Sequence, residues 1–342
     1  MEKKILITGG LGFLGQHLAR YLLRTYPVCR LTIIDNLSSS EINYRWLHNR
    51  AEILTADFKT VSLASRRFSR IYHLASPVGS LGILTRSGYV AKEITDLALR
   101  AGELAADNGA AVLYVSSSEV YGKAGVQRED DELAVPVQTG TRMEYSLGKL
   151  AGEHLLRNLA ARFGFRLTVV RPFNALGEGQ SAQIGFVVPT FFRNALAGKP
   201  LPLFNGGNQM RCFCHAEDVA RGLVAIQERG KDCHTYNLGN PGNAVTIREL
   251  AMRIRELCAS NSQLETVHPT QRFGAHYLEA SAKSPCIDKI KADTGWTPAI
   301  DLDSALTRVY YYYSTMPEGY SCSPFVLGTS DLTSAVETTP SN

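Results

Sequence analysis

The sequence predicts an α/β protein with a doubly wound parallel sheet, followed by a smaller, discontinuous C-terminal lobe. In the first half of the chain, short apolar runs alternate with longer amphipathic stretches. Apolar strands separated by helical segments are typical of a parallel sheet that carries helices on both faces. Beyond Arg171 the pattern becomes irregular, because proline and glycine interrupt shorter elements. A chain of 342 residues is long enough to bury the cores of both parts.

The strands are expected where short apolar runs occur, at residues 4–8, 31–35, 51–55, 71–75, 111–116 and 167–171. Helices are expected where apolar residues recur at three- and four-residue spacing, at 12–25, 89–108 and 142–163. Residues 215–228 and 235–238 have the pattern of a helix and a strand that rejoin the sheet. We therefore assign 1–171, rejoined by about 212–240, to the first domain, and 172–211 and 241–315 to the second lobe. Residues 316–342, rich in Ser, Thr, Pro and Gly, are predicted to be a mobile tail rather than a docked segment.

Composition argues against several classes of protein. The formal charge is +4, and the Lys and Arg residues are scattered, so no nucleic-acid patch is expected, whereas an anionic small substrate fits. No apolar run approaches the roughly 20 residues that cross a bilayer, and the first residues enter a strand directly. We therefore predict a cytoplasmic protein with no membrane partner.

The cysteines point to a reducing compartment, because there are seven of them without paired spacing. Cys212, Cys214 and His215 raise the question of a metal site. They follow one another too closely and no second pair completes a tetrahedral set, so no metal is predicted. Alternation along one strand would place Cys212 and Cys214 on the same face as ordinary packing.

A glycine-rich loop follows the first predicted strand and opens the first predicted helix. Gly9, Gly12 and Gly15 permit a tight turn, a close approach to phosphate and a helix–strand contact. Backbone amides at the start of a helix can face a pyrophosphate. The loop therefore predicts a bound dinucleotide.

Acidic residues after the second and third strands bear on which dinucleotide is bound. Asp35 ends the second predicted strand, where a carboxylate can accept hydrogen bonds from the adenosine ribose hydroxyls. It would repel a 2′-phosphate, and no arginine follows it immediately, so NAD is favoured over NADP. Asp57 and Phe58 fit an adenine contact, although an exposed loop aspartate would look the same.

Tyr145 and Lys149 lie four residues apart on a predicted helix and therefore share one face. A tyrosine with its ordinary pKa of about 10 is a poor base near neutral pH, unless a nearby cation stabilises the phenolate. Lys149, and the positive charge of an oxidised nicotinamide, would lower the pKa of Tyr145. With the hydroxyl of Ser117, the pair predicts a site that takes a proton from a sugar hydroxyl.

With these features, the chain resembles the extended short-chain dehydrogenase/reductase family over nearly its whole length apart from residues 316–342. Further motifs that carry the resemblance are the runs 72–77, 116–122, 171–174, 206–211, 236–239 and 294–298. The resemblance implies a Rossmann-type NAD-binding domain, a C-terminal lobe that binds substrate, and tightly held NAD. Members of the family are typically nucleotide-sugar epimerases, dehydratases and decarboxylases.

Carried over by position, Ser117, Tyr145 and Lys149 match the active-site residues of the family, and Lys149 would also hold the nicotinamide ribose. The resemblance further implies cofactor contacts at Phe13, Leu14, Asn36, Leu74, Ala75 and Pro172. It implies contacts with the nucleotide diphosphate at Asn174 and Arg211, and contacts with the base, commonly uracil, around Val188. Ordinary packing of the lobe would explain the segment around Val188 equally well.

The residues after Ser117 help to choose a reaction. Ser118 and Glu119 resemble the Ser-Glu pair of UDP-glucuronate decarboxylases, and Arg142 matches the arginine three residues before their catalytic tyrosine. In a uronate, a ketone at C4 makes the sugar a β-keto acid, so carbon dioxide can leave C5 while the ketone takes up the electrons. Glu119 would orient the carboxylate or manage a proton.

Other positions depart from that pattern and keep alternatives open. Lys283 stands where these decarboxylases commonly have an arginine, Ile94 stands where an asparagine is usual, and residues 78–88 lack the proline-rich run. UDP-glucuronate decarboxylation is the first hypothesis, C4 epimerisation of a UDP-sugar the second, and 4,6-dehydration the third. A dinucleotide-sensing binding protein is the non-enzyme alternative. A homodimer is expected through the helices at 89–108 and 142–163, although packing within one chain would give the same pattern.

Overall fold

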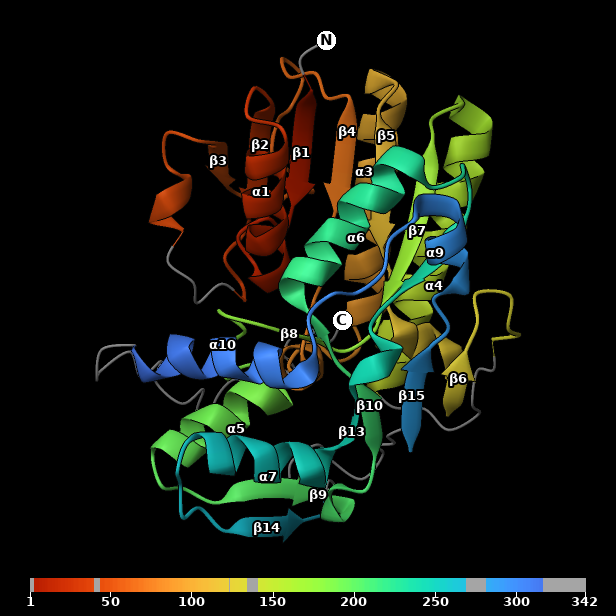
Figure 1. Ribbon diagram of the computed structural model, residues 1–342. Helices are drawn as coiled ribbons and strands as arrows, with labels where there is room; N and C mark the ends of the chain where they lie inside the picture. Colours follow the sequence, from red (N-terminus) through yellow and green to blue (C-terminus); the bar gives the residue numbers. More distant parts are fainter. Residues whose placement is uncertain (1–2, 40–43, 123, 134–140, 269–280, 316–342) are drawn as a thin grey trace, which may run out of the picture.

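The computed structural model describes residues 3–39, 44–122, 124–133, 141–268 and 281–315, so the segment 316–342 predicted to be mobile lies outside the described residues. Its centre is a parallel sheet of seven strands in the order β12-β7-β5-β4-β1-β2-β3, which confirms the predicted fold class (Figure 1). The strands are β1 (Lys4–Thr8), β2 (Arg30–Asp35), β3 (Glu52–Thr55), β4 (Arg70–His73), β5 (Ala111–Val115), β7 (Leu167–Pro172) and β12 (Thr235–Leu238).

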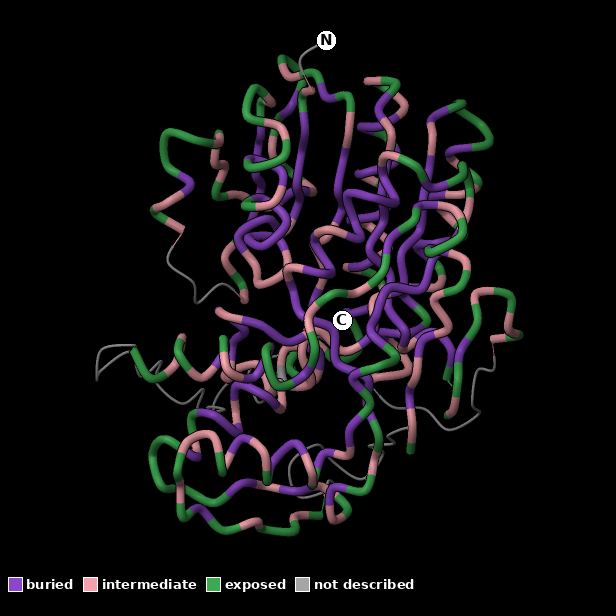
Figure 2. The backbone as a smooth tube through the Cα atoms, viewed as in Figure 1, coloured by how far each residue is buried: buried purple, intermediate pink, exposed green. Residues whose placement is uncertain are grey.

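Helices cover both faces of the sheet because successive strand residues point to opposite sides. Ile5 and Ile7 of β1 pack with helices α1 and α6, whereas Leu6 between them packs with α3 and α4. Figure 2 shows the resulting buried strands between partly exposed helices. The bounds are α1 (Phe13–Thr25), α3 (Val90–Asn108), α4 (Thr141–Phe163) and α6 (Ala216–Arg229). No helix in the described ranges is long and apolar enough to pass through a membrane.

The second lobe has its own core, in which Phe191, Phe192 and Leu250 are fully or almost fully buried. A four-stranded sheet, in the order β13-β10-β15-β6, and the pair β14-β9 belong to this part of the molecule. Its elements are β6 (Gly125–Gln127), α5 (Val187–Leu196), β9 (Leu201–Phe204), η3 (Asn205–Gly207), β10 (Met210–Cys212), η4 (Pro241–Asn243), β13 (Ala244–Thr246), α7 (Ile247–Leu257), β14 (Leu264–Val267), β15 (Ala282–Pro285) and α10 (Leu302–Ser314). Helix α9 (Asp288–Thr294) packs instead on α6 and β12, and its Ile290 lies in the core of the central domain. Short elements elsewhere are η1 (Arg45–Leu47), α2 (Ser80–Leu84), η2 (Ser118–Tyr121), β8 (Ala175–Leu176) and β11 (Cys214–His215).

The expected strand through Cys212 and Cys214 is wrong. Cys212 ends β10, and Cys214 begins β11, which pairs with β8 in a different sheet. Both side chains are buried. Alternation within a single strand therefore does not explain their position. The chain changes sheets between them.

Two glycines let α4 approach its neighbours closely. A Cβ at Gly148 would lie 2.8 Å from the Cα of Ala91 on α3, and a Cβ at Gly152 would lie 2.4 Å from the hydroxyl of Tyr114 on β5. Contacts this short do not occur for real side chains. The glycines therefore bring the part of α4 that carries Tyr145 and Lys149 close to both α3 and β5.

Candidate active site

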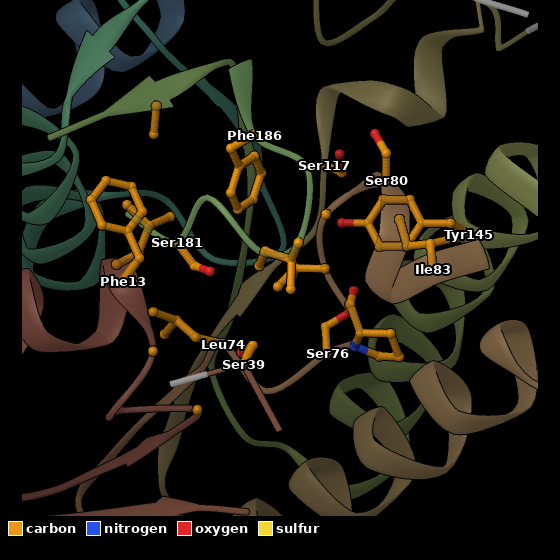
Figure 3. Close-up of a pocket in the computed structure, with 18 of the residues that line it drawn as sticks. Phe13, Ser39, Leu74, Ser76, Ser80, Ile83, Ser117, Tyr145, Ser181 and Phe186 are labelled. Atoms are coloured by element: carbon orange, nitrogen blue, oxygen red, sulfur yellow. The ribbon is translucent and has the colours of Figure 1, made fainter. Parts of the chain in front are cut away.

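A cavity opens at the carboxyl ends of the central strands, where doubly wound sheets usually bind their ligands. It is lined by the ends of β2, β4, β5 and β7, by the start of α4, and by lobe segments within residues 179–191 and 202–211. Figure 3 shows Phe13 and Leu74 on one side and Tyr145 and Ile83 on the other, with the Tyr145 hydroxyl facing inward. The cavity thus joins the predicted dinucleotide site to the predicted catalytic residues.

The glycine loop fits a dinucleotide pyrophosphate in its packing and its charge. A Cβ at Gly9 would lie 2.8 Å from the backbone nitrogen of Ala75, and one at Gly15 would lie 2.4 Å from the carbonyl oxygen of Gly9. At Gly12, the N-cap of α1, the nearest atom would be 3.4 Å away. The first turn of α1 contains no acidic residue of its own, so the positive end of the helix faces the cavity.

Asp35 braces this loop. Its carboxylate accepts hydrogen bonds from the backbone amides of Leu11, at 3.0 Å, and Leu37, at 2.8 Å. Burial raises the pKa of Asp35, and these backbone hydrogen bonds oppose the rise. Because Asp35 also lines the cavity, it can shape the loop and face a ribose at the same time.

We expect Asp35→Ala to weaken NAD binding by about 10–100-fold, because charged hydrogen bonds of this kind contribute about 1.5–3 kcal/mol. Titration calorimetry with NAD measures the change. Glu52→Ala, at the start of β3, is the matched control, since Glu52 pairs with Arg66 and does not line the cavity. Equal affinity in the wild type and Asp35→Ala would show that Asp35 has no part in binding.

Tyr145 and Lys149 both lie on α4 and line the cavity, and Ser117 faces them from the end of β5. Ser117 forms a hydrogen bond with the phenol of Tyr145. The Lys149 ammonium donates to the backbone oxygen of Val115 at 2.8 Å and lies 5.9 Å from the centre of the Tyr145 ring. Ser117, Tyr145 and Lys149 are therefore brought together as the sequence predicts.

The expected low pKa of Tyr145 is wrong for the protein as described. Burial raises the pKa of Tyr145 well above its ordinary value; the hydrogen bond from Ser117 and the charge of Arg142 offset only part of this rise. Burial also lowers the pKa of Lys149 to about 7, although the charge of Glu153 opposes the change. Loss of water on burial has the largest effect on the pKa of both groups, and spacing along a helix does not reveal it.

A charged cluster of Glu119, Arg142 and Lys283 lies beside this group. One carboxylate oxygen of Glu119 accepts from Lys283 at 2.6 Å and from Arg142 at 2.9 Å. Burial alone would raise the pKa of Glu119, but the two cations outweigh it and hold that pKa far below its usual range. Glu119 and Arg142 line the cavity. Lys283 does not line it, but it contacts Glu119, which does.

The structure brings most of the remaining predicted residues to the cavity wall. They are Phe13, Leu14, Asn36, Asp57, Phe58, Leu74, Ala75, Ser118, Pro172, Asn174 and Arg211. The exception is Val188, which lies in the core of the second lobe. Helix α5 begins at Val187, and successive helix residues point in different directions, so the side chain of Val188 points into the lobe core. Phe186 and Val187 line the cavity instead.

Sequence reasoning missed two wall segments, 76–83 and 179–184. Gly79 seats one against the other, since a Cβ there would lie 2.4 Å from the carbonyl oxygen of Ile184. Both segments contain glycines with positive φ, Gly79 and Gly179, which is the signal a sequence carries for such close turns.

Ile83 and Ile94 pack with Tyr145. At Ile94, an apolar side chain therefore stands where the family pattern expects an asparagine. No group of three or more potential metal ligands occurs within the described ranges.

A family model described as the NAD dependent epimerase/dehydratase family matches residues 5–239. The chain is 31% identical over 317 residues to UDP-glucuronic acid decarboxylase 1 of Danio rerio, covering 92% of this chain and 73% of the relative. It is also 31% identical over 307 residues to UDP-glucuronic acid decarboxylase 3 of Arabidopsis thaliana, covering 89% and 86%.

Among solved structures, an epimerase from Methanothermobacter thermautotrophicus superposes with a TM-score of 0.81. It is 25% identical, and the match covers 92% of each chain. This similarity extends across both the central sheet and the second lobe.

Proposed function

Because the chain belongs to the NAD dependent epimerase/dehydratase family, we propose that it oxidises C4 of a nucleotide sugar and decarboxylates UDP-glucuronate. The product would be UDP-xylose or the UDP-4-keto-pentose. The observation that carries this proposal is the charged cluster beside Tyr145. The decarboxylase relatives support the same reaction.

The dinucleotide would lie along the first domain. Gly9, Gly12 and Gly15 would face its pyrophosphate, Asp35 its adenosine ribose, and Lys149 its nicotinamide ribose. When bound, the nicotinamide supplies a hydride acceptor. Residues 172–211 and 241–315 would bind the nucleotide sugar, with Asn174 and Arg211 facing the diphosphate.

The charge around the cavity suits a uronate. Arg142 and Lys283 carry two positive charges against the single negative charge of Glu119, so the cluster has a surplus of one positive charge. Glu119 alone would repel a sugar carboxylate, but the two cations on one of its oxygens reverse the sign of the local field. A neutral hexose would leave this surplus uncompensated in a partly buried site.

Each residue has a distinct task in the first step. Ser117 orients the C4 hydroxyl, the Lys149 ammonium stabilises Tyr145 as a phenolate, and this phenolate accepts the proton of the C4 hydroxyl while the hydride leaves C4. The ketone at C4 then allows the bond from C5 to the carboxylate to break, with its electron pair delocalised into the ketone. Arg142 would hold the carboxylate until carbon dioxide leaves, and the Lys283 ammonium, oriented by the Glu119 carboxylate, would return a proton to C5.

We expect mass spectrometry of incubations with UDP-glucuronate to find a product that has lost carbon dioxide. UDP-glucose and UDP-N-acetylglucosamine serve as parallel substrates, since neither carries a carboxylate. Absence of carbon dioxide loss would reject decarboxylation. An isomer of unchanged mass would indicate the second candidate, C4 epimerisation, which the similar epimerase structure supports. Loss of water would indicate 4,6-dehydration, and binding without turnover a dinucleotide sensor.

We also propose a cytoplasmic homodimer that pairs α3 and α4 with their copies. Leu99, Leu147 and Phe163 on these helices are apolar and between 39% and 51% exposed. Burial of such side chains against a second copy would stabilise the pair. Sedimentation at micromolar concentration measures the state, and a monomer would reject it.

A further inference from the structure

Val115, the last residue of β5, and the two serines that follow it contact three residues on one face of α4. Val115 accepts from the ammonium of Lys149 at 2.8 Å, and Ser117 bonds to the phenol of Tyr145. Between them in the chain, the hydroxyl of Ser116 donates to Glu153 at 2.5 Å. Tyr145, Lys149 and Glu153 follow one another at four-residue intervals, so they form one row along the helix. We call these contacts the β5–α4 seam.

Glu153 differs from the other two residues of the row, because it does not line the cavity. Its side chain is 2% exposed, and its carboxylate forms two hydrogen bonds with the guanidinium of Arg171 on β7, at 2.9 and 2.8 Å. Arg171 in turn lies over the ring of Tyr121, 4.9 Å from its centre. A buried ion pair of this kind is often no more stabilising than well-packed apolar residues. Its position one helical turn beyond Lys149 points to another role.

The surroundings of the Lys149 ammonium make that role electrostatic. Tyr114 on β5 and Tyr145 on α4 present their rings to it, and His73 on β4 is near enough to have its own pKa lowered by the Lys149 charge. Burial lowers the pKa of Lys149, and among the described groups acting on it Glu153 is the one that raises it. Arg171 moderates this effect by pairing with Glu153.

We propose that Glu153 is a positioning residue that holds α4 in register on β5 and supplies the negative charge that keeps Lys149 an ammonium. It acts through Lys149 and Ser116 and does not touch the substrate. Only the catalytic use of the Lys149 ammonium rests on the proposed function. The ionisation of Lys149 can be measured with no substrate present.

The test is the titration of Lys149 followed by NMR on protein labelled with ¹³C at the lysine ε-carbon, with the signal assigned by its loss in Lys149→Met. In the wild type the midpoint is expected near 7. Glu153→Gln keeps the shape of the side chain and removes its charge. The midpoint should fall by about one pH unit or more, because the ammonium loses its counter-charge while Arg171 stays positive.

Two further variants separate this effect from damage to the fold. Glu153→Gln with Arg171→Met removes both buried charges, so its midpoint should lie below the wild type but above Glu153→Gln alone. If Glu153→Gln does not fold, this double variant carries the measurement. Glu228→Gln is the matched control, since that carboxylate pairs with Arg70 far from the seam, and the midpoint should not move.

An unchanged Lys149 midpoint in the folded charge-free variants would overturn the proposal. A lowered midpoint supports it even where UDP-glucuronate gives no product, so failure of the proposed function stays distinguishable. Where turnover is observed, the proposal also predicts how Glu153→Gln changes the pH dependence of the rate. Activity requires the ammonium and is lost as pH rises through the Lys149 pKa, so Glu153→Gln should lose activity at a lower pH than the wild type.

Discussion

Tyr145→Phe should lower turnover by about 10²–10⁴-fold, the usual contribution of a positioned general base. NAD should remain bound, because the ring of Tyr145 packs with Ile83, Val90 and Ile94, and phenylalanine keeps these contacts. Single-turnover rates and the amount of NAD carried by the purified protein measure the two properties separately. The substrate is the one identified with the panel of UDP-sugars.

Tyr72→Phe is the matched control for this variant. Tyr72 is fully buried on β4, and its hydroxyl has no hydrogen-bond partner among the described residues. Removing that hydroxyl should leave turnover unchanged. If Tyr145→Phe kept more than about a tenth of the wild-type rate, Tyr145 would not be the base.

Gly15→Ala should both destabilise the fold and abolish dinucleotide binding. The new Cβ would lie 2.4 Å from the carbonyl oxygen of Gly9 and 2.6 Å from the Cα of Gly10, and backbone atoms cannot rotate away. Strain of about 3 kcal/mol, less about 1 kcal/mol gained in helix propensity, leaves a net loss of about 2 kcal/mol. Differential scanning calorimetry should show a Tm about 3 °C lower.

Gly12→Ala separates folding from binding in the same loop. Its Cβ would come no closer than 3.4 Å to another atom, so the Tm without ligand should change little. NAD binding should still weaken, because the methyl group occupies space the pyrophosphate needs. An equal fall of Tm in both variants would contradict these separate roles.

The periodic features of the sequence predicted the central sheet and its helices closely. Strands β1 and β12 have the predicted bounds, because each is a short buried run that is followed directly by a glycine. β4 ends at His73, two residues early, because Leu74 turns the chain toward the glycine loop, where the amide of Ala75 meets the Thr8 hydroxyl. Propensity does not record such a tertiary contact.

The sequence predicted which residues form the site, but it did not predict the contacts and pKa values of those residues. Spacing placed Tyr145 beside Lys149, but the pKa of each depends on the water removed by neighbours from other elements. Lys283 was expected to contact substrate, whereas the parallel pairing of β15 with β6 brings it behind Glu119. The sequence does not predict that Glu153 is buried, because a charged residue on an amphipathic helix ordinarily lies on its exposed face.

The exchange of strands between the two parts of the molecule constrains how the chain can fold during synthesis. β12 completes the central sheet beside β7, and β6, from the first half of the chain, pairs with β15 near its end. A nascent chain that has emerged only as far as β7 therefore holds an unpaired sheet edge, and unpaired edges attract other chains. Chaperone protection should matter most in this interval, and a fragment ending at Arg171 should aggregate.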